Sequence, residues 1–207
     1  GTEVTSSMDG QKFTLHAGDY YHIDYEIKLP GEHQIKNTSV AIVAAKLVSK
    51  QDARINEIAL HMGVANTFWP GRLERIAQKP DLILDGAHNP DGALALRKAL
   101  DKYYPGKKVH FVFGMMGDKD MSGVIKTLIK KDDVVLTVRA DGGVRAAEAD
   151  ALANLVGANA VAESDLQTAY HKAMSLAGED GVGCVCGSLY LVGEFKAMLQ
   201  REKEQCH

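Results

Sequence analysis

The sequence predicts an α/β protein whose second part is a mostly parallel sheet with helices on both faces. Two observations carry this prediction. Five strand-and-helix pairs follow one another from Trp69 onward, and a different pattern of two strands and two helices precedes them. Alternating strands and helices are typical of parallel sheets, because each helix carries the chain back to the start of the next strand. We expect one complete domain and a piece of another.

The first part of the chain is expected to form a half-buried hairpin and two helices. Strands are predicted at residues 12–16 and 21–29, since apolar and polar residues alternate in the second of these segments. Residues 35–49 carry apolar side chains at helical spacing. A short second helix is expected between an N-cap at Asp52 and a closing glycine, Gly63. These elements look like the tail of a domain.

The second part is expected to alternate strands with helices over its whole length. Open parallel sheets bind ligands beyond the carboxyl ends of their strands, near helix N-termini whose free amides attract anions. The segments at those ends are rich in glycine and polar residues, so one edge of the sheet should be the working edge. The predicted strands are residues 82–85, 109–113, 134–138, 158–162 and 182–186; the predicted helices are residues 93–103, 121–130, 147–155, 166–176 and 189–200; the edge segments are residues 85–90, 114–120, 139–145 and 187–188.

Composition excludes several classes of protein. The 207 residues carry a net charge of −3, and Lys and Arg are scattered, so no footprint for nucleic acid is present. The longest apolar stretch, residues 40–48, is broken by Lys46 and is far shorter than the roughly 20 residues that span a bilayer. With three cysteines and no apolar leader, the chain fits a reducing cytoplasm. Cys184 and Cys186 lack a paired histidine motif, which favours reduced core cysteines over a zinc site.

Two motifs carry the functional signal: WPGRLE at residues 69–74 and DGAHNP at residues 85–90. With GEHQ at residues 31–34, GDKD at residues 117–120 and the segment GSLYLVGE that begins at Gly187, the sequence resembles the folylpolyglutamate synthase family over essentially its whole length. The related cell-wall ligases, which add amino acids to UDP-muramoyl peptides, share parts of both motifs but typically have Tyr where this chain has Gly86. That difference favours the folate branch.

The resemblance implies an ATP-dependent ligase of the Mur ligase superfamily. In such a reaction ATP, with Mg²⁺, phosphorylates a carboxylate of the folate, and the amine of an incoming glutamate then attacks the acyl phosphate. The resemblance also implies domains. Residues 1–66 would be the tail of the central ATPase domain plus a linker, and residues 67–207 would be a Rossmann-like C-terminal domain that binds glutamate.

The resemblance further implies roles for five residues on the nucleotide side. Arg72 should contact the ATP phosphates through its planar, permanently charged guanidinium, and His88 should lie near the same phosphates. Asp85 should accept hydrogen bonds from the ribose hydroxyls. Gln34 and Asn37 match the adenine side, where amides offer a donor and an acceptor. Taken singly, an Asp before Gly is more often a turn former and an Arg more often a surface ion pair.

On the glutamate side, analogy with the wider superfamily points to Lys119 and Ser188 as the residues that hold the carboxylates of the amino acid. A lysine charge and a helix N-terminus both suit a carboxylate. The alternative is that residues 117–118 form a solvated turn and that Ser188 is a simple N-cap. Arg145 is a further candidate with less support.

No segment matches G-x-x-x-x-G-K-[ST], the phosphate loop that the family carries in its N-terminal domain. The chain is therefore expected to be a fragment without the N-terminal ATPase half, the folate site and most metal ligands, and to be inactive alone. Three alternatives stay open: part of a UDP-muramoyl-peptide ligase, a non-catalytic α/β module that binds nucleotides or amino acids, and a dehydrogenase. The last is weakened because no G-x-G-x-x-G follows a strand.

Overall fold

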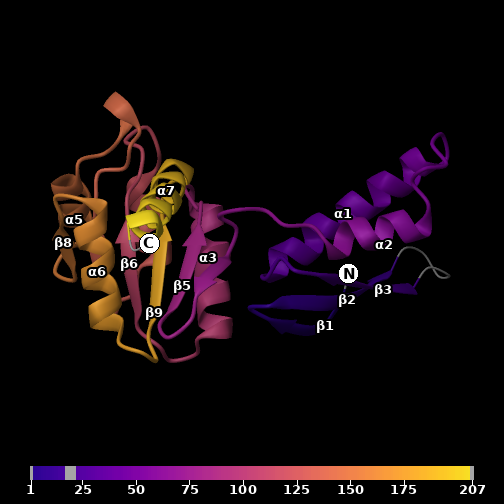
Figure 1. Ribbon diagram of the computed structural model, residues 1–207, viewed down its shortest axis with the longest axis horizontal. Helices are drawn as coiled ribbons and strands as arrows, with labels where there is room; N and C mark the ends of the chain where they lie inside the picture. The colour runs from indigo at the N-terminus through magenta and orange to yellow at the C-terminus, as the bar shows by residue number, and fades with distance from the viewer. Residues whose placement is uncertain (1, 17–21, 206–207) are drawn as a thin grey trace. The chain divides into compact units, whose positions relative to one another are not determined.

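The computed structural model describes residues 2–16 and 22–205, and the chain divides into two compact units, Gly1–Pro70 and Gly71–His207 (Figure 1). Tyr21 of the second predicted strand and Cys206 lie outside the described residues. Within the described ranges, no helix has both the length and the apolar character that crossing a membrane requires. The assignment of residues 1–66 and 67–207 to named domains stays a prediction.

A three-stranded antiparallel sheet forms one side of the first unit, in the order β1 (Thr2–Ser7), β2 (Gly10–His16) and β3 (His22–Ile27). The strands β2 and β3 confirm the predicted hairpin over its described residues. Strand β1 was not predicted, because its sequence lacks alternating apolar residues and most of its side chains are exposed. The buried amide of Gln11 in β2 donates hydrogen bonds to the carbonyls of Leu29 and Gly31, both at 2.8 Å, and so ties the sheet to the helix that follows.

Helix α1 (Glu32–Ser49) confirms the first predicted helix. The apolar residues at helical spacing between positions 40 and 48, which were expected to face the core, are mostly exposed. The helix instead buries Ile35 and Ile42 in the core of this unit. Large apolar side chains therefore stay exposed on α1 and on the next helix, namely Val40, Val43, Leu47, Val48, Ile58 and Met62.

Helix α2 (Glu57–Ala65) exists as predicted, but both of its predicted ends are wrong. Its N-cap is Asn56, whose Oδ1 accepts the amide of Ala59 at 2.9 Å. Asp52 lies in the turn before this helix, where its carboxylate forms an ion pair with its near neighbour Arg54. Gly63 lies inside the helix and does not close it, since Asn66 takes the C-cap.

The second unit is built on a six-stranded sheet in the order β4-β5-β9-β6-β7-β8. All neighbouring strands run parallel except β4, an antiparallel edge strand that was not predicted. The predicted, mostly parallel sheet is thus confirmed. Its strands are β4 (Glu74–Ala77), β5 (Asp81–Asp85), β6 (Val109–Phe113), β7 (Val134–Thr137), β8 (Ala160–Ala162) and β9 (Val182–Cys186).

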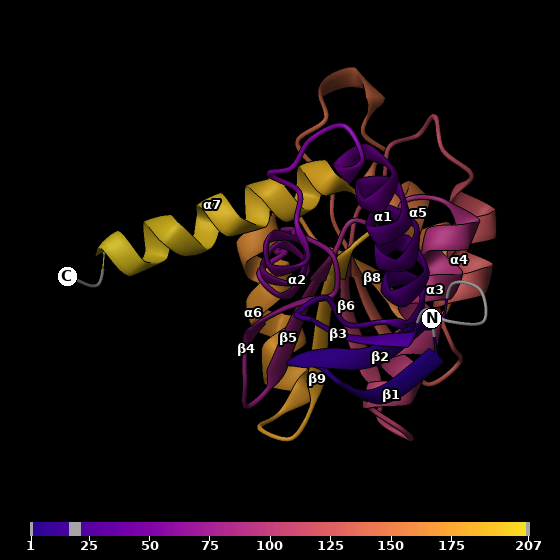
Figure 2. The same ribbon diagram turned by 90° about the vertical axis from the view of Figure 1, so that its right-hand side faces the viewer.

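Helices cover both faces of this sheet, as predicted (Figure 1). One face packs against α6 and α7 through a cluster that includes Leu84, Val185 and Phe195. Side chains that point to the opposite face, such as Phe111 and Cys184, have no exposed surface either, so both faces are buried. Figure 2 shows the second half of α7 extending past the sheet. The helices are α3 (Pro90–Tyr103), α4 (Met121–Leu128), α5 (Ala149–Val156), α6 (Leu166–Ala177) and α7 (Leu189–Gln205).

The ends of the parallel strands are in register. Cys186 at the end of β9 is paired with Asp85 of β5 on one side and with Phe113 of β6 on the other. Phe113 is paired in turn with Thr137 of β7. Because parallel strands in register end at a common line, the loops that follow them lie along one edge. The predicted edge segments of β5, β6, β7 and β9 therefore share that edge, which we call the carboxyl edge. Buried Cys184 and Cys186 are free thiols, as predicted.

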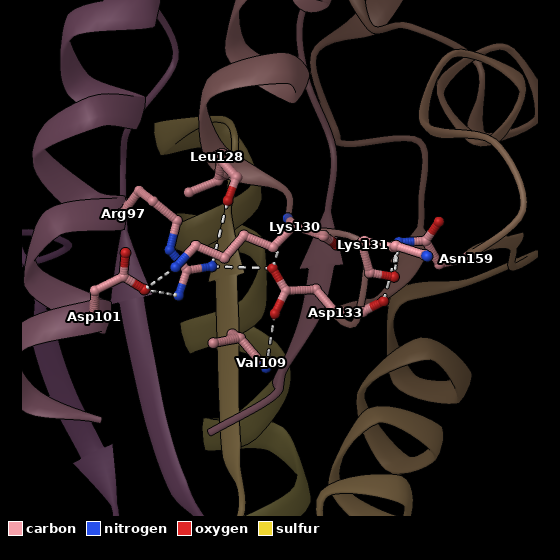
Figure 3. A network of polar contacts seen from close by, with 8 residues as sticks. All are labelled: Arg97, Asp101, Val109, Leu128, Lys130, Lys131, Asp133 and Asn159. Carbon is pink, nitrogen blue, oxygen red and sulfur yellow. Dashed lines mark hydrogen bonds and ion pairs between the residues drawn. The ribbon is translucent and has the colours of Figure 1, made fainter. Parts of the chain in front are cut away.

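The opposite edge of the sheet is held by a polar network around Arg97 and Asp133, which are 6% and 3% exposed (Figure 3). The Nη1 atom of Arg97 in α3 lies 3.0 Å from Oδ2 of Asp133, just before β7. The same carboxylate accepts the amides of Val109 at 3.0 Å and Lys130 at 2.9 Å. Asp101, which is half-exposed, contacts Arg97 at 2.8 Å from the solvent side. Both oxygens of Asp133 are bonded, while the buried Nε of Arg97 has no hydrogen-bond partner among the described residues. The network therefore ties α3 to the starts of β6 and β7.

Candidate functional site

A tight turn presents Arg72 at the carboxyl edge. Its neighbours Gly71 and Leu73 both have left-handed backbones, with φ of 68° and 45°. This conformation costs a non-glycine residue about 1 to 2 kcal/mol, so the surroundings must enforce it at Leu73. The side chain of Leu73 is 1% exposed and anchors the turn in the core. The strain is stored next to the residue that the sequence motif singled out.

Three hydrogen bonds of 2.8 Å hold the turn in place. The amide of Leu73 donates to Oδ2 of Asp85, and the amide of Gly86 donates to the carbonyl of Gly71. The amide of Gly71 donates to Oε2 of Glu74. These contacts join the WPGRLE and DGAHNP motifs into one local structure, although the two motifs lie on different elements.

Asp85 is a buried carboxylate at the end of β5, 5% exposed. Its Oδ1 accepts the amide of Ala87 at 2.8 Å, while Oδ2 accepts that of Leu73. Burial raises the pKa of Asp85 above its usual value, and the two amides and the nearby charge of Arg72 offset this only in part. Because it accepts the amides of both Leu73 and Ala87, the carboxylate of Asp85 organises the turn. Its predicted contact with ribose would use the lone pairs that remain on the two oxygens.

Arg72 itself is half-buried, and within the described residues its guanidinium has no hydrogen-bond or ion-pair partner. A half-buried cation without a partner on the protein favours an anionic ligand. His88 is also half-buried, and its Nδ1 lies 2.9 Å from the carbonyl of Gly86. Because a carbonyl only accepts, Nδ1 carries the hydrogen, and Nε2 is left for another partner.

The glycine at position 86 has a steric cause. A Cβ atom there would clash with the side chain of Leu189, at the start of α7. The cell-wall ligases typically have Tyr at this point of the motif, and a tyrosine here would require the half-exposed side chain of Leu189 to move aside. The glycine that distinguishes this chain from the cell-wall ligases thus lies directly against Leu189.

Lys119 and Ser188 lie in adjacent loops of the same edge, after β6 and β9. The loops approach closely, since a side chain at Gly187 (φ 103°) would meet the carbonyl of Gly114. Lys119 is exposed, and no described residue pairs with its ammonium group. Ser188 is 3% exposed, and its Oγ accepts the amide of Tyr190 at 3.1 Å, so it acts as a helix cap. Whether it also meets a ligand stays a prediction.

Arg145 belongs to the same edge but has partners. Its Nη2 lies 3.0 Å from the hydroxyl of Tyr190, and the guanidinium stands 5.7 Å from the centre of that ring. Asp118 lies 4.0 Å from its Nη1. The carbonyl of Arg145 also accepts the amide of Gly117 at 2.7 Å, which joins the two loops. These contacts brace the loop that carries Lys119.

Gln34 and Asn37 belong to the first unit. Both lie on the first turns of α1, where Nδ2 of Asn37 donates to Oε1 of Gln34 at 3.2 Å. Gln34 is buried and Asn37 is exposed. The pair is thus preassembled, and Arg72, Asp85 and His88 form a separate group in the second unit. Across the described ranges, no group of three or more His, Cys, Asp or Glu side chains could hold a metal ion.

Two functional candidates were missed from the sequence: Glu74 and Lys196. Oε2 of Glu74 accepts the amide of Gly71, and Nζ of Lys196 lies 2.7 Å and 3.0 Å from its two carboxylate oxygens. Glu74 was part of the motif, but nothing in the sequence linked it to a lysine 122 residues away. The one available signal was the spacing of Leu189, Val192 and Lys196, which places the three side chains on one face of a helix.

The fold and this edge define the class: an α/β protein with an open parallel sheet and a cationic turn at its carboxyl edge. Residues 71–189 match the family described as "Mur ligase, glutamate ligase domain". The match covers more than half of the chain, and the chain belongs to this family.

Within this family, the chain is similar to proteins named folylpolyglutamate synthase. The folylpolyglutamate synthase of Lacticaseibacillus casei is 30% identical over 92% of this chain and 44% of its own length. The structure of Mycobacterium tuberculosis folylpolyglutamate synthase complexed with ADP has a TM-score of 0.80 at 28% identity, over 93% of this chain and 46% of that one. The bifunctional folylpolyglutamate synthase/dihydrofolate synthase of Yersinia pestis, complexed with AMPPNP and a Mn ion, has a TM-score of 0.64 at 34% identity, over 70% of this chain and 35% of that one. The chain therefore spans less than half the length of these relatives.

Proposed function

We propose that this chain is the C-terminal part of a folylpolyglutamate synthase, a cytoplasmic ligase that uses ATP to add glutamate to folate. One observation carries the proposal: a half-buried Arg72, which has no partner among the described residues, is held in a strained turn at the carboxyl edge of a glutamate ligase domain. Such a cation suits phosphate groups. The likeness to folylpolyglutamate synthases supports folate as the acceptor.

ATP fits the residues of this edge. Bound ATP would supply the phosphoryl group that activates a substrate carboxylate. Arg72 binds and orients the terminal phosphates, and Nε2 of His88 faces the same group as a hydrogen-bonding partner. Asp85 keeps the turn in place and offers its free lone pairs to the ribose. For the adenine, the resemblance to the family keeps Gln34 and Asn37 of the first unit as the proposed residues.

The remaining parts of the reaction are assigned to an N-terminal ATPase half. That half would bring the phosphate loop, the folate site and the ligands of Mg²⁺. Exposed apolar residues on α1 and α2 support this part of the proposal, because a domain body packed on these helices would bury them. The Mn ion in the Yersinia pestis protein supports a divalent cation.

The main alternative is a ligase that adds amino acids to UDP-muramoyl peptides. Gly86 and its contact with Leu189 argue against it. A non-catalytic module that senses nucleotides or amino acids is the other alternative. Such a module could bind ATP through Arg72 but would form no amide product, so the assay below distinguishes the two.

The decisive assay uses the complete protein with Mg-ATP, glutamate and one acceptor at a time. The acceptors are a reduced folate, dihydropteroate and a UDP-muramoyl peptide, and mass spectrometry detects the amide product while a coupled assay follows ADP. We expect a glutamylated folate that requires ATP and glutamate together. A product formed only with the UDP-muramoyl peptide would contradict the proposal, and a product with dihydropteroate would add dihydrofolate synthesis.

The isolated chain of 207 residues is expected to be inactive and to bind ATP weakly. Phosphate binding would be divided between two domains, so only one half of the contacts is present. Calorimetric titration with Mg-ATP measures this directly. Sub-micromolar affinity, or glutamate-dependent release of phosphate by the chain alone, would contradict the division.

Replacing Lys119 with Met is expected to raise the KM for glutamate of the complete enzyme about tenfold or more, because a charge-assisted hydrogen bond of about 1.5 to 3 kcal/mol is lost. The KM for ATP should change little. Ser188→Ala should act in the same direction but more weakly, since the helix amides remain. Lys126→Met, an exposed lysine on α4, is the matched control. Normal glutamate kinetics in both Lys119→Met and Ser188→Ala would show that residues 117–120 form only a turn.

A further inference from the structure

We propose that Lys196 of α7 is a positioning residue for Arg72 and acts through the carboxylate of Glu74. This inference rests on the proposed function, because the contact between Arg72 and ATP is part of that proposal. Glu74 and Lys196 would not touch the nucleotide. Their role is to hold the turn that carries Arg72 in its strained conformation.

The carboxylate of Glu74 serves two partners at once. Its Oε2 accepts the amide of Gly71, the first residue of the turn, at 2.8 Å. Lys196 contacts both oxygens from the other side, at 2.7 Å and 3.0 Å. The side chain of Glu74 is 11% exposed, so removal of the lysine would leave a mostly buried carboxylate without its counter-charge. Such a carboxylate would turn toward water and release the amide of Gly71.

Helix α7 supports the turn with one continuous face. Leu189, Val192 and Lys196 are spaced by three and four residues and therefore lie on the same side of the helix. A side chain at Gly71 would press on Val192, and one at Gly86 would clash with Leu189. Helix α7 therefore lies close to the backbone of both glycines. The ion pair of Lys196 with Glu74 adds a direct link between this helix and the turn.

The turn needs this support because it does not hold itself. Leu73 has a left-handed backbone that a leucine would leave if its restraints were removed. Asp85 restrains the far end through the amide of Leu73, while Glu74 restrains the near end through Gly71. Arg72 lies between these two restraints. Loss of the near one would let the guanidinium sample positions away from the phosphates.

The test uses the complete enzyme with Lys196→Met, which keeps most of the stem and removes the charge. We expect kcat to fall about tenfold, as expected for misplacement of one catalytic contact, with the KM for glutamate nearly unchanged. Lys196→Arg should restore most of the rate. The matched control is Lys172→Met, which removes the partner of another buried glutamate, Glu163, at 2.8 Å and just after the edge strand β8. That control should lose stability to a similar degree and keep its rate.

A double-mutant cycle with Arg72→Ala decides whether the lysine acts through the arginine. If it does, Lys196→Met should have almost no further effect in the Arg72→Ala background. Fully additive losses would overturn the proposal. Amide hydrogen exchange gives a second readout that needs no activity: exchange at Gly71 and Leu73 should accelerate in Lys196→Met and stay unchanged in Lys172→Met. Unchanged exchange at these amides would overturn the positioning role. A wild-type enzyme that makes no glutamylated folate would contradict the proposed function instead.

Discussion

Arg72→Ala is expected to lower kcat/KM of the complete enzyme. The loss should correspond to about 2 to 4 kcal/mol of transition-state stabilisation. The guanidinium is half-buried and has no partner among the described residues, so its charge is available to the phosphates. Negative charge develops on the transferred group in the transition state, which is why the loss should be larger in kcat than in substrate binding. Steady-state kinetics with varied ATP measures both.

Arg72→Lys is the companion variant. It keeps the charge but loses the planar fork that contacts two oxygens at once, so we expect a loss intermediate between wild type and Arg72→Ala. Arg54→Ala, which removes an exposed arginine of the first unit, should leave the kinetics unchanged. Activity of Arg72→Ala within twofold of wild type would show that Arg72 is only a surface residue.

Asp133→Ala is expected to destabilise the second unit by about 3 to 5 kcal/mol, because it leaves the buried charge of Arg97 without its buried partner and with only the half-exposed Asp101. The amides of Val109 and Lys130 would also lose their acceptor. Urea denaturation followed by circular dichroism measures the free energy of unfolding.

Asp101→Ala is the matched control for Asp133→Ala. It removes a second carboxylate from the same Arg97, but that carboxylate is 42% exposed, so the loss should stay below about 1 kcal/mol. Replacing both Arg97 and Asp133 with apolar residues should recover much of the stability. Equal losses for Asp101→Ala and Asp133→Ala would show that burial does not set the strength of the pair.

Much of the fold could be predicted because the apolar periodicity of the second unit is strong and agrees with its caps. Strands such as β9 are continuous apolar runs; N-cap residues such as Asn89 mark where helices begin, and glycines such as Gly157 mark where they end. The edge strand β4 was missed, because its four residues, three half-exposed and one exposed, carry no clear pattern. Asp52 and Asn56 are both good N-cap residue types, and only the structure shows that the helix begins after Asn56.

The site was predictable only where it is encoded in contiguous motifs. Residue type and order pointed to Arg72, Asp85 and His88 as a group, and the register of the strands places their segments on one edge. The left-handed backbone of Leu73 could not be read from a residue that seldom adopts it. Lys196 could not be linked to Glu74 either, since the contact depends on how α7 packs against the turn.

The central claim, that the carboxyl edge of the six-stranded sheet binds the phosphates of ATP, is tested most directly by a crystal structure of the complete protein with AMPPNP and Mg²⁺. The account predicts a guanidinium nitrogen of Arg72 within about 3 Å of an oxygen of a terminal phosphate. Asp85 should keep both of its amide bonds in that complex. A nucleotide whose phosphates do not contact Arg72, or one bound at the opposite edge beside Arg97, would contradict the account.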